Sequence, residues 1–509
     1  MKKIQFSILI TVVLFAVTFT SCKKYLDINT DPDRIPATNP PIAQLLTNAQ
    51  INQANDMGGD FWRFSGLIVQ YVSGQVSQPN QTYEYGRYNI SGSDQNNLWA
   101  NVYSNTLNDL ELVIKNATIG GSPHYSGVAK IMKAYEYQIM VDTWGDVPFS
   151  EAQQLAENRA PKYDKAEDIY KGLIDLLNQG IAEVNATTSN LSPGSNSLIY
   201  TTSSFNAAAK ANWVKLANTL KMRIYLHYSK KDPAFMVSQM NALIASGATF
   251  FASNADNYEF KFRNEPNARN PIDQFERARS NYLFADSNIV SIMNMKNDPR
   301  RASYFTPFPY NSSPATYKGV KPGDVATVNY SRMHTYLRGG VVTVAATAIN
   351  AAGGIVSSTA INYTGDAPLR MVTYPEYCFI RAEAALRGVG VIADAQIWYT
   401  RGITASMEAA GVSAANITTY LATNGILAGT PTAQIAQVIT EKYIALYGVA
   451  VEPWTDYRRT GVPPLVVPSN AVETAVPRSL FYPQSEIDLN PSGPGQKGSQ
   501  QARIFWDTP

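Results

Sequence analysis

Tyrosine, arginine and amide side chains interleave in two segments of this sequence, 83–88 and 270–282. A sugar ring has apolar C–H faces edged by hydroxyl groups, so a carbohydrate receptor needs flat aromatic rings with guanidinium and amide donors beside them. If 83–88 is extended, Tyr83 and Tyr85 point to one face of the backbone. We predict that both segments form a single ligand platform on one face of the molecule, with these contact residues: Tyr83, Tyr85, Arg87, Tyr88, Asn270, Phe275, Arg279 and Tyr282. The alternative site lies in later loops, at Tyr304, Tyr310, Tyr317 and Tyr330.

Residues that could carry catalysis or hold a metal are few. The sequence has no His-Glu-x-x-His, Gly-x-Ser-x-Gly or phosphate-loop motif, and it contains three histidines and two cysteines. Asp142, Asp146 and Glu151 could serve as the paired carboxylates of a glycosidase, although a capped turn after a helix explains the same residues. Acidic residues and an asparagine alternate over 27–33, but Pro32 stands where a calcium loop requires glycine. We predict no catalytic residue, no metal and no cofactor.

The composition narrows the class of protein. The chain has 509 residues, 45% of them hydrophobic, which is enough for a large folded core. Its formal net charge is +2, and Lys2 and Lys3 account for that excess. A chain so nearly neutral has no general attraction for phosphate backbones, so we expect no nucleic-acid partner. Tyrosine is unusually abundant, with 30 residues.

The first 22 residues predict the cellular compartment. Two lysines precede an apolar run over 4–20, which is shorter than the roughly 20 residues that span a bilayer and has the order of a secretory signal. Phe19-Thr20-Ser21-Cys22 places a cysteine where bacterial lipoproteins are cut and acylated, although leucine is more usual than Phe19. We predict a signal peptide over 1–21, lipid attachment at Cys22 and a tether over 22–40. An ordinary signal peptide followed by an incidental cysteine is the alternative.

Apolar residues recur at helical spacing along most of the remaining chain. The stripes lie at 94–116, 125–141, 164–184, 213–224 and 435–446, and further helices fit 41–53, 59–72, 233–246, 286–296, 374–387, 393–410 and 452–459. Short turns join these helices in pairs, which is typical of stacked helical hairpins. Between about 250 and 370 the pattern changes to polar loops and short β-prone runs, at 258–262 and 340–347. We therefore predict an all-α protein with one loop and short-strand excursion.

Several longer segments stand in a fixed order along the chain: YLDINTDPD at 25–33, DTWGDVPFSEA at 142–152, WVKLANTLKMR at 213–223, DPRRASYF at 298–305, EYCFIRAEA at 376–384, EKYIALYGVAVEPWTDYRRTG at 441–461 and PRSLFYPQSE at 477–486. Together they resemble the SusD/RagB family of surface glycan-binding lipoproteins, in particular its SusD-like branch. The resemblance covers nearly the whole chain. The shared motifs sit on scaffold helices and turns, so the resemblance does not assign binding residues.

This resemblance implies a tetratricopeptide-like superhelix over 41–509, with a helical scaffold at 41–249 and 371–509 and a variable ligand-facing excursion at 250–370. It also implies a lipid-anchored protein on the cell-surface side of the outer membrane. Such a protein binds oligosaccharide or polysaccharide without catalysis and delivers it to a SusC-like TonB-dependent transporter. Two alternatives stay open, a lipoprotein glycoside hydrolase and a transporter lid for peptide or another nutrient.

Overall fold

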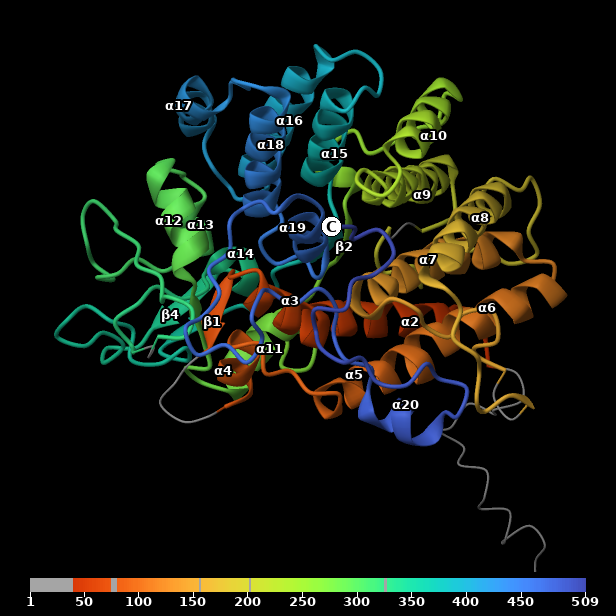
Figure 1. Cartoon of the computed structure of the whole chain (residues 1–509), viewed down its shortest axis with the longest axis horizontal. Helices are drawn as coiled ribbons and strands as arrows, with labels where there is room; N and C mark the ends of the chain where they lie inside the picture. Colours follow the sequence, from red (N-terminus) through yellow and green to blue (C-terminus); the bar gives the residue numbers. More distant parts are fainter. Residues whose placement is uncertain (1–39, 75–79, 155–156, 201–202, 325–326) are drawn as a thin grey trace, which may run out of the picture.

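The protein is an arc of helical pairs with short two-stranded ribbons beside and among the helices. The computed structural model describes residues 40–509 except 75–79, 155–156, 201–202 and 325–326. Successive helices follow the arc from α2 through α7, α8, α9 and α10 to α15, α16 and α18 (Figure 1). The predicted all-α superhelix is confirmed. The predicted signal peptide, Cys22 and nearly all of the tether lie outside the described residues.

The first part of the scaffold consists of helices joined by short turns. They are α2 (Ile42–Asp56), η1 (Met57–Phe61), α3 (Trp62–Ile68), α4 (Gln81–Gly86), η2 (Ser93–Gln95), α5 (Asn96–Asn101), η3 (Val102–Leu107), α6 (Asn108–Ile119), α7 (Pro123–Trp144), α8 (Ala166–Val184), α9 (Ala207–His227) and α10 (Pro233–Ala245). Helix α7 ends at Gly145, whose φ of 87° lies in the left-handed region that glycine tolerates. The turn predicted after this helix is therefore present.

The excursion contains more helix than predicted. Its elements are η5 (Asn254–Asp256), β2 (Tyr258–Phe260), α11 (Pro271–Ala278), β3 (Leu283–Ala285), α12 (Ser287–Met295), α13 (Arg301–Tyr304), α14 (Thr335–Arg338), β4 (Val341–Val344), β5 (Ile361–Tyr363) and β6 (Leu369–Val372). Strands β2 and β4 lie within the runs predicted to be β-prone. Each pairs antiparallel, β2 with β6 and β4 with β5, while β3 pairs with β1 (Val72–Gly74) of the scaffold.

The chain returns to helical hairpins at Tyr374, as predicted. The closing elements are α15 (Tyr374–Leu386), α16 (Asp394–Ala409), α17 (Ala414–Asn424), α18 (Pro431–Ala445), α19 (Glu452–Thr460) and α20 (Gln484–Leu489). Helices α15, α16, α17 and α18 enclose a hydrophobic cluster of their own, which includes Phe379, Tyr399 and Ile403. The main cluster joins the rest of the scaffold to the excursion.

Many of the abundant tyrosines belong to this main core. Tyr71, Tyr304, Tyr336, Tyr443 and Tyr447 are buried and pack ring against ring; the Tyr304 and Tyr447 rings, for example, are stacked with centroids 4.7 Å apart. The Tyr443 hydroxyl donates to the Val69 carbonyl oxygen at 2.8 Å, and the Tyr304 hydroxyl donates to that of Ile444 at 3.1 Å. Where helices meet, tyrosine therefore supplies both buried apolar area and hydrogen bonds to backbone carbonyl groups.

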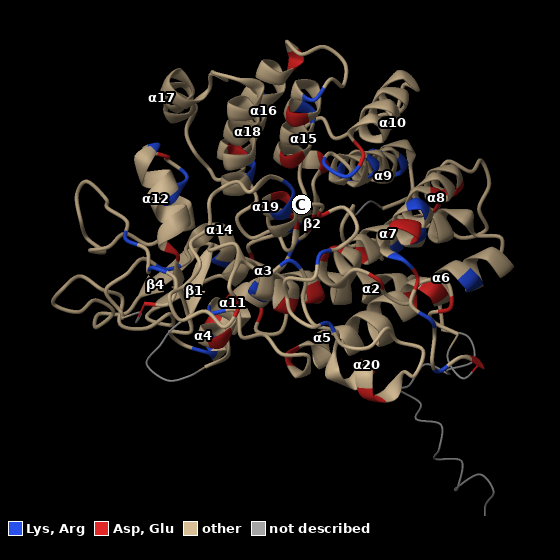
Figure 2. Ribbon diagram, viewed as in Figure 1, with Lys and Arg blue, Asp and Glu red and all other residues tan. Residues whose placement is uncertain are grey.

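Charged side chains are spread over the molecule rather than gathered on one side. Basic and acidic residues are interspersed over most of the ribbon in Figure 2, although some elements such as α17 (Ala414–Asn424) carry none. Within the described ranges, none of the helices combines the length and the hydropathy that a membrane span requires.

Candidate functional site

The two segments predicted to form the platform lie together. The Thr82 hydroxyl on α4 donates to the carbonyl oxygen of Tyr282 at 2.7 Å. Just beyond these residues, Ser73 of β1 pairs with Phe284 of β3. A segment from the scaffold and a segment from the excursion thus meet although about 200 residues separate them in the chain.

Both segments are largely helical where loops were predicted, and 83–88 is not extended. The Asn80 side chain accepts a hydrogen bond from the Tyr83 backbone N–H at 3.0 Å and begins α4. In α11 the Asn270 side chain does the same for Ile272 at 2.8 Å, and Pro271 occupies the first turn. Residues two apart in a helix point in nearly opposite directions. Tyr83 and Tyr85 therefore do not share a face: Tyr85 is buried, whereas Tyr83 is half-buried.

Four of the eight predicted contact residues are buried, and their side chains stabilise the fold. The Tyr85 ring packs on Phe64, with centroids 4.8 Å apart, and its hydroxyl donates to Asp94 Oδ1 at 3.0 Å. The Asn270 Nδ2 donates to the Ala367 carbonyl oxygen at 3.0 Å. Tyr88 is fully buried, and Phe275 is 8% exposed.

The other four predicted residues reach the surface. Tyr83 and Arg87 are half-buried and are both held by Asn470: Asn470 Nδ2 lies 2.9 Å from the Tyr83 hydroxyl, and Arg87 Nε donates to the Asn470 carbonyl oxygen at 3.0 Å. Arg279 is exposed and Tyr282 is half-buried. With Arg63, these four residues form what we call the α4–α11 surface.

Arg279 and Tyr282 carry the uncommitted polar groups of the α4–α11 surface. Within the described part of the chain, neither the Arg279 guanidinium nor the Tyr282 hydroxyl makes a hydrogen bond or an ion pair. Both side chains contact the Phe275 ring. Its centroid is 5.2 Å from Arg279 Cζ and 6.1 Å from the Tyr282 ring centroid.

Arg63 extends the same surface, and sequence reasoning did not select it. Its Cζ lies 4.3 Å from the Phe275 ring centroid, and it forms an ion pair with Asp60. Burial lowers the pKa of Arg63, while the Asp60 carboxylate opposes that shift. The surface therefore presents an aromatic edge beside guanidinium donors, which is a chemistry suited to hydroxyl-rich ligands.

Of the four tyrosines of the predicted alternative site in the later loops, three reach the surface. Tyr304 is fully buried in the core. Tyr310, Tyr317 and Tyr330 are half-buried, and Lys318 Nζ lies 4.6 Å from the Tyr330 ring centroid.

The carboxylates around Trp144 are committed to the scaffold. Asp142 is fully buried and accepts from Trp506 Nε1 at 2.9 Å and from the Tyr170 hydroxyl. Asp146 accepts from the Ala166 backbone N–H at 2.8 Å and so caps α8. Glu151 accepts from the Lys162 N–H at 3.2 Å. The Asp146 and Glu151 contacts match the capped-turn interpretation, whereas Asp142 lies inside α7 and binds side chains of the core.

Asp142, His227 and Glu452 place ligand atoms within 4.8 Å of one another, as a metal site would. All three side chains are buried. Cations of the protein already compensate them, because Lys442 Nζ lies 3.0 Å and Arg223 Nε 3.6 Å from Glu452 carboxylate oxygens. The cluster is therefore part of a buried ion network that joins helices α7, α9, α18 and α19.

Comparison with known proteins places this chain in a family. Residues 33–483 match the model of the SusD-like family, which is described as starch-binding and associating with the outer membrane. The chain belongs to this SusD-like family. No curated protein matches the chain by sequence.

Solved structures with the same fold include binding proteins for glycans. One, a chitin-binding protein, is 25% identical with a TM-score of 0.73 over 92% of this chain and 100% of its own. A chitin-binding SusD homologue from Flavobacterium johnsoniae is 22% identical, with a TM-score of 0.70 over 91% and 98% of the two chains. A SusD homologue from Bacteroides uniformis is 21% identical, with a TM-score of 0.70 over 91% and 99%.

Proposed function

We propose that this protein binds an oligosaccharide at the α4–α11 surface, on the outer face of the outer membrane, and delivers it to a SusC-like TonB-dependent transporter. The observation that carries the proposal is the family match over 33–483, because that family is described by starch binding and outer-membrane association. The 25% identical chitin-binding protein supports a glycan as the ligand class. The commitment of Asp142, Asp146 and Glu151 to the scaffold favours binding over hydrolysis.

The α4–α11 surface supplies the chemistry that this proposal needs. The apolar face of a sugar ring can stack on Tyr282, while its hydroxyl groups accept from Arg279 and exchange hydrogen bonds with the Tyr282 hydroxyl. Arg63 contacts the same Phe275 ring as this pair, and Thr82, next to Tyr83, donates to the Tyr282 carbonyl oxygen.

Tyr282→Ala should weaken glycan binding by about tenfold or less, because an aromatic stacking contact contributes roughly 0.5–1.5 kcal/mol beyond its buried area. Isothermal titration calorimetry measures the change. The matched control is Tyr374→Ala, which removes another half-buried tyrosine, at the start of α15. Equal losses in the two variants, or no loss in Tyr282→Ala with its melting temperature kept, would place the site elsewhere.

Cys22→Ala should release the protein from the membrane fraction, because we propose that acyl chains on Cys22 are its anchor. Each buried methylene of such a chain contributes about 0.8 kcal/mol. Cys378→Ala is the matched control: the Cys378 thiol is buried in α15, so its loss leaves the anchor intact. Retention of the Cys22→Ala protein in carbonate-washed membranes would refute the lipoprotein assignment.

A further inference from the structure

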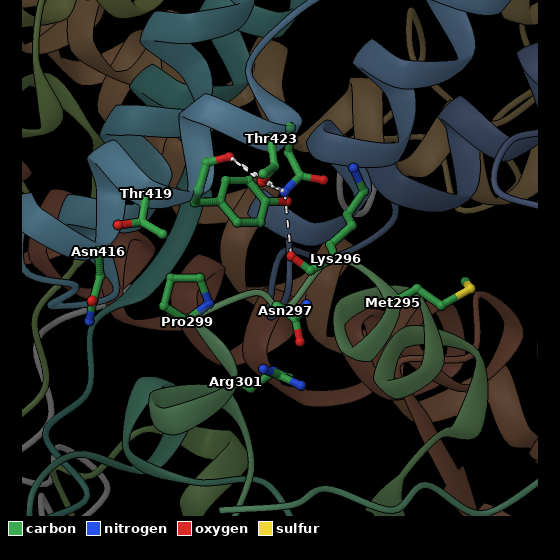
Figure 3. Close-up of a pocket in the computed structure, with 10 residues that line it drawn as sticks. Met295, Lys296, Asn297, Pro299, Arg301, Asn416, Thr419 and Thr423 are labelled. Atoms are coloured by element: carbon green, nitrogen blue, oxygen red, sulfur yellow. Dashed lines mark hydrogen bonds between the residues drawn. The ribbon is translucent and has the colours of Figure 1, made fainter. Parts of the chain in front are cut away.

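A pocket lies away from the α4–α11 surface, between α12–α13 and α17. Its volume is about 490 Å³. Figure 3 shows Asn416 and Thr419 of α17 on one side, Met295 and Lys296 at the end of α12 on the other, and Arg301 nearby. Figure 1 places these helices at the opposite side of the ribbons from α4.

The walls of this pocket are fixed by buried contacts. Arg300, fully buried behind the pocket, binds Glu441 at 2.8 Å as well as Asp298. The Tyr420 hydroxyl of α17 donates to the same Glu441 at 2.6 Å. Asn424 Nδ2, at the end of α17, donates to the Lys296 carbonyl oxygen at 3.4 Å. The two walls therefore share one buried ion cluster, and the pocket is formed before any ligand arrives.

The lining is positively charged. None of the residues that line the pocket in the described structure is an aspartate or a glutamate, whereas Lys296 and Arg301 both line it. Lys296 Nζ is paired with Glu441 Oε1 at 3.0 Å. Arg301 instead donates to two uncharged oxygens, the Asp298 carbonyl at 2.8 Å and Asn294 Oδ1 at 2.7 Å. The Arg301 guanidinium is thus held in place, but its charge has no carboxylate partner among the described residues.

The remaining polar groups of the lining are hydroxyls and amides. The side-chain amides of Asn297 and Asn416 are exposed and make no hydrogen bond within the described parts of the chain. Thr419 and Thr423 add hydroxyl groups, and Pro299 and Met295 add apolar surface. Amides and hydroxyls match the hydroxyl groups of a saccharide, while an oriented, uncompensated guanidinium matches an anionic group.

From this geometry we propose that the α12–α17 pocket is a second binding site, for saccharide units that carry a carboxylate or a sulfate. The anionic group binds Arg301, and the neighbouring hydroxyl groups bind Asn297, Asn416 and Thr419. Neutral saccharides bind there more weakly because they leave the Arg301 charge uncompensated. This site does not depend on the α4–α11 surface, so experiments can support ligand binding at one of the two and reject it at the other.

Met295 provides a local readout. It is 78% exposed at the rim of the pocket, so its methyl resonance reports only on events there. The full chain, purified in detergent and labelled with ¹³C-methyl methionine, is titrated with tetragalacturonate, with a sulfated disaccharide and with neutral chitotetraose; Met295→Leu assigns the signal. We expect an acidic saccharide to shift the Met295 methyl resonance. We expect neutral chitotetraose to bind with a dissociation constant about ten times higher.

Variants on both walls test the assigned contacts. Arg301→Gln should weaken acidic saccharide binding about tenfold or more, and Thr419→Ala should weaken it measurably. Thr418→Ala is the control, because both threonines are exposed on α17 and bond a carbonyl four residues earlier at 3.0 Å, but only Thr419 lines the pocket. A Met295 methyl that no acidic saccharide moves would overturn the proposal. So would equal shifts with chitotetraose, or with inorganic sulfate alone at matched ionic strength.

Discussion

Arg223→Met should lower the free energy of unfolding by about 3–5 kcal/mol, because it leaves a buried carboxylate without its partner. Arg223 is fully buried on α9, and its Nε and Nη2 each donate to the Glu376 carboxylate of α15 at 2.6 Å. It also donates to Gln138 Oε1 of α7 at 3.2 Å. One guanidinium therefore ties together three helices that are distant in sequence. Urea denaturation measures the loss.

The pH dependence of this variant identifies the cause. Burial raises the pKa of Glu376 and the Arg223 charge opposes that rise, so removing Arg223 raises the pKa further. A carboxyl whose folded-state pKa exceeds its unfolded value binds a proton more tightly when folded. The free energy of unfolding of Arg223→Met should therefore fall as the pH rises above the pKa of a glutamate in the unfolded chain, about 4.3. The deficit relative to the unmodified protein should be smallest at pH 4.

Arg223→Met combined with Glu376→Gln should recover part of the lost stability, because no buried charge is then left alone. A double variant as unstable as Arg223→Met at every pH would show that lost packing, rather than the unpaired Glu376, causes the effect.

Trp454→Ala should cost about 3–5 kcal/mol of unfolding free energy, as large-to-small changes in cores do. Trp454 on α19 is 1% exposed, and its Nε1 donates to the Pro477 carbonyl oxygen at 2.7 Å. The Arg458 guanidinium carbon lies 3.9 Å from its ring centroid. The substitution leaves a cavity and an unpaired carbonyl at one position, and it removes one of the two rings, Trp454 and Trp506, over which the Arg458 guanidinium lies. Calorimetric melting measures the loss.

Trp398→Ala is the comparison for this prediction. Trp398 on α16 is half-buried, with Arg401 Cζ 4.9 Å from its ring centroid. Its replacement removes less buried area, so the melting temperature should fall less than in Trp454→Ala. The reverse order would contradict the assignment of Trp454 as the packing centre between α19 and the C-terminal segment.

Helices with an apolar stripe could be predicted from the sequence, and those without one could not. Residues 166–184 carry a regular stripe, and α8 lies within one residue or two of its predicted bounds. Helix α17 buries only Ile417 and Tyr420, so its Ala/Thr/Asn-rich sequence resembles a loop. Helix α11 was missed for a similar reason, although Asn270 and Pro271 are an ordinary helix start.

The candidate site was predictable in position but not in detail. Interleaved aromatic and polar residues marked 83–88 and 270–282, and the Thr82–Tyr282 hydrogen bond shows that these segments meet. Which side chains reach the surface depends on helical rather than extended backbone, and composition does not distinguish the two. Tyr85 and Tyr88 were therefore predicted as ligand contacts together with Tyr282, although they are buried. Arg63 was missed because it belongs to α3, whose other residues form an apolar core stripe.

The most direct test of glycan binding at the α4–α11 surface is calorimetry of the full chain in detergent. A panel of maltooligosaccharides, chitooligosaccharides and other soluble glycans is titrated into the unmodified protein and into a variant with both Arg279→Ala and Tyr282→Ala. We predict that at least one glycan binds the unmodified protein and that the folded double variant loses most of that affinity. Binding of no glycan, or an unchanged dissociation constant in the double variant, would contradict the account.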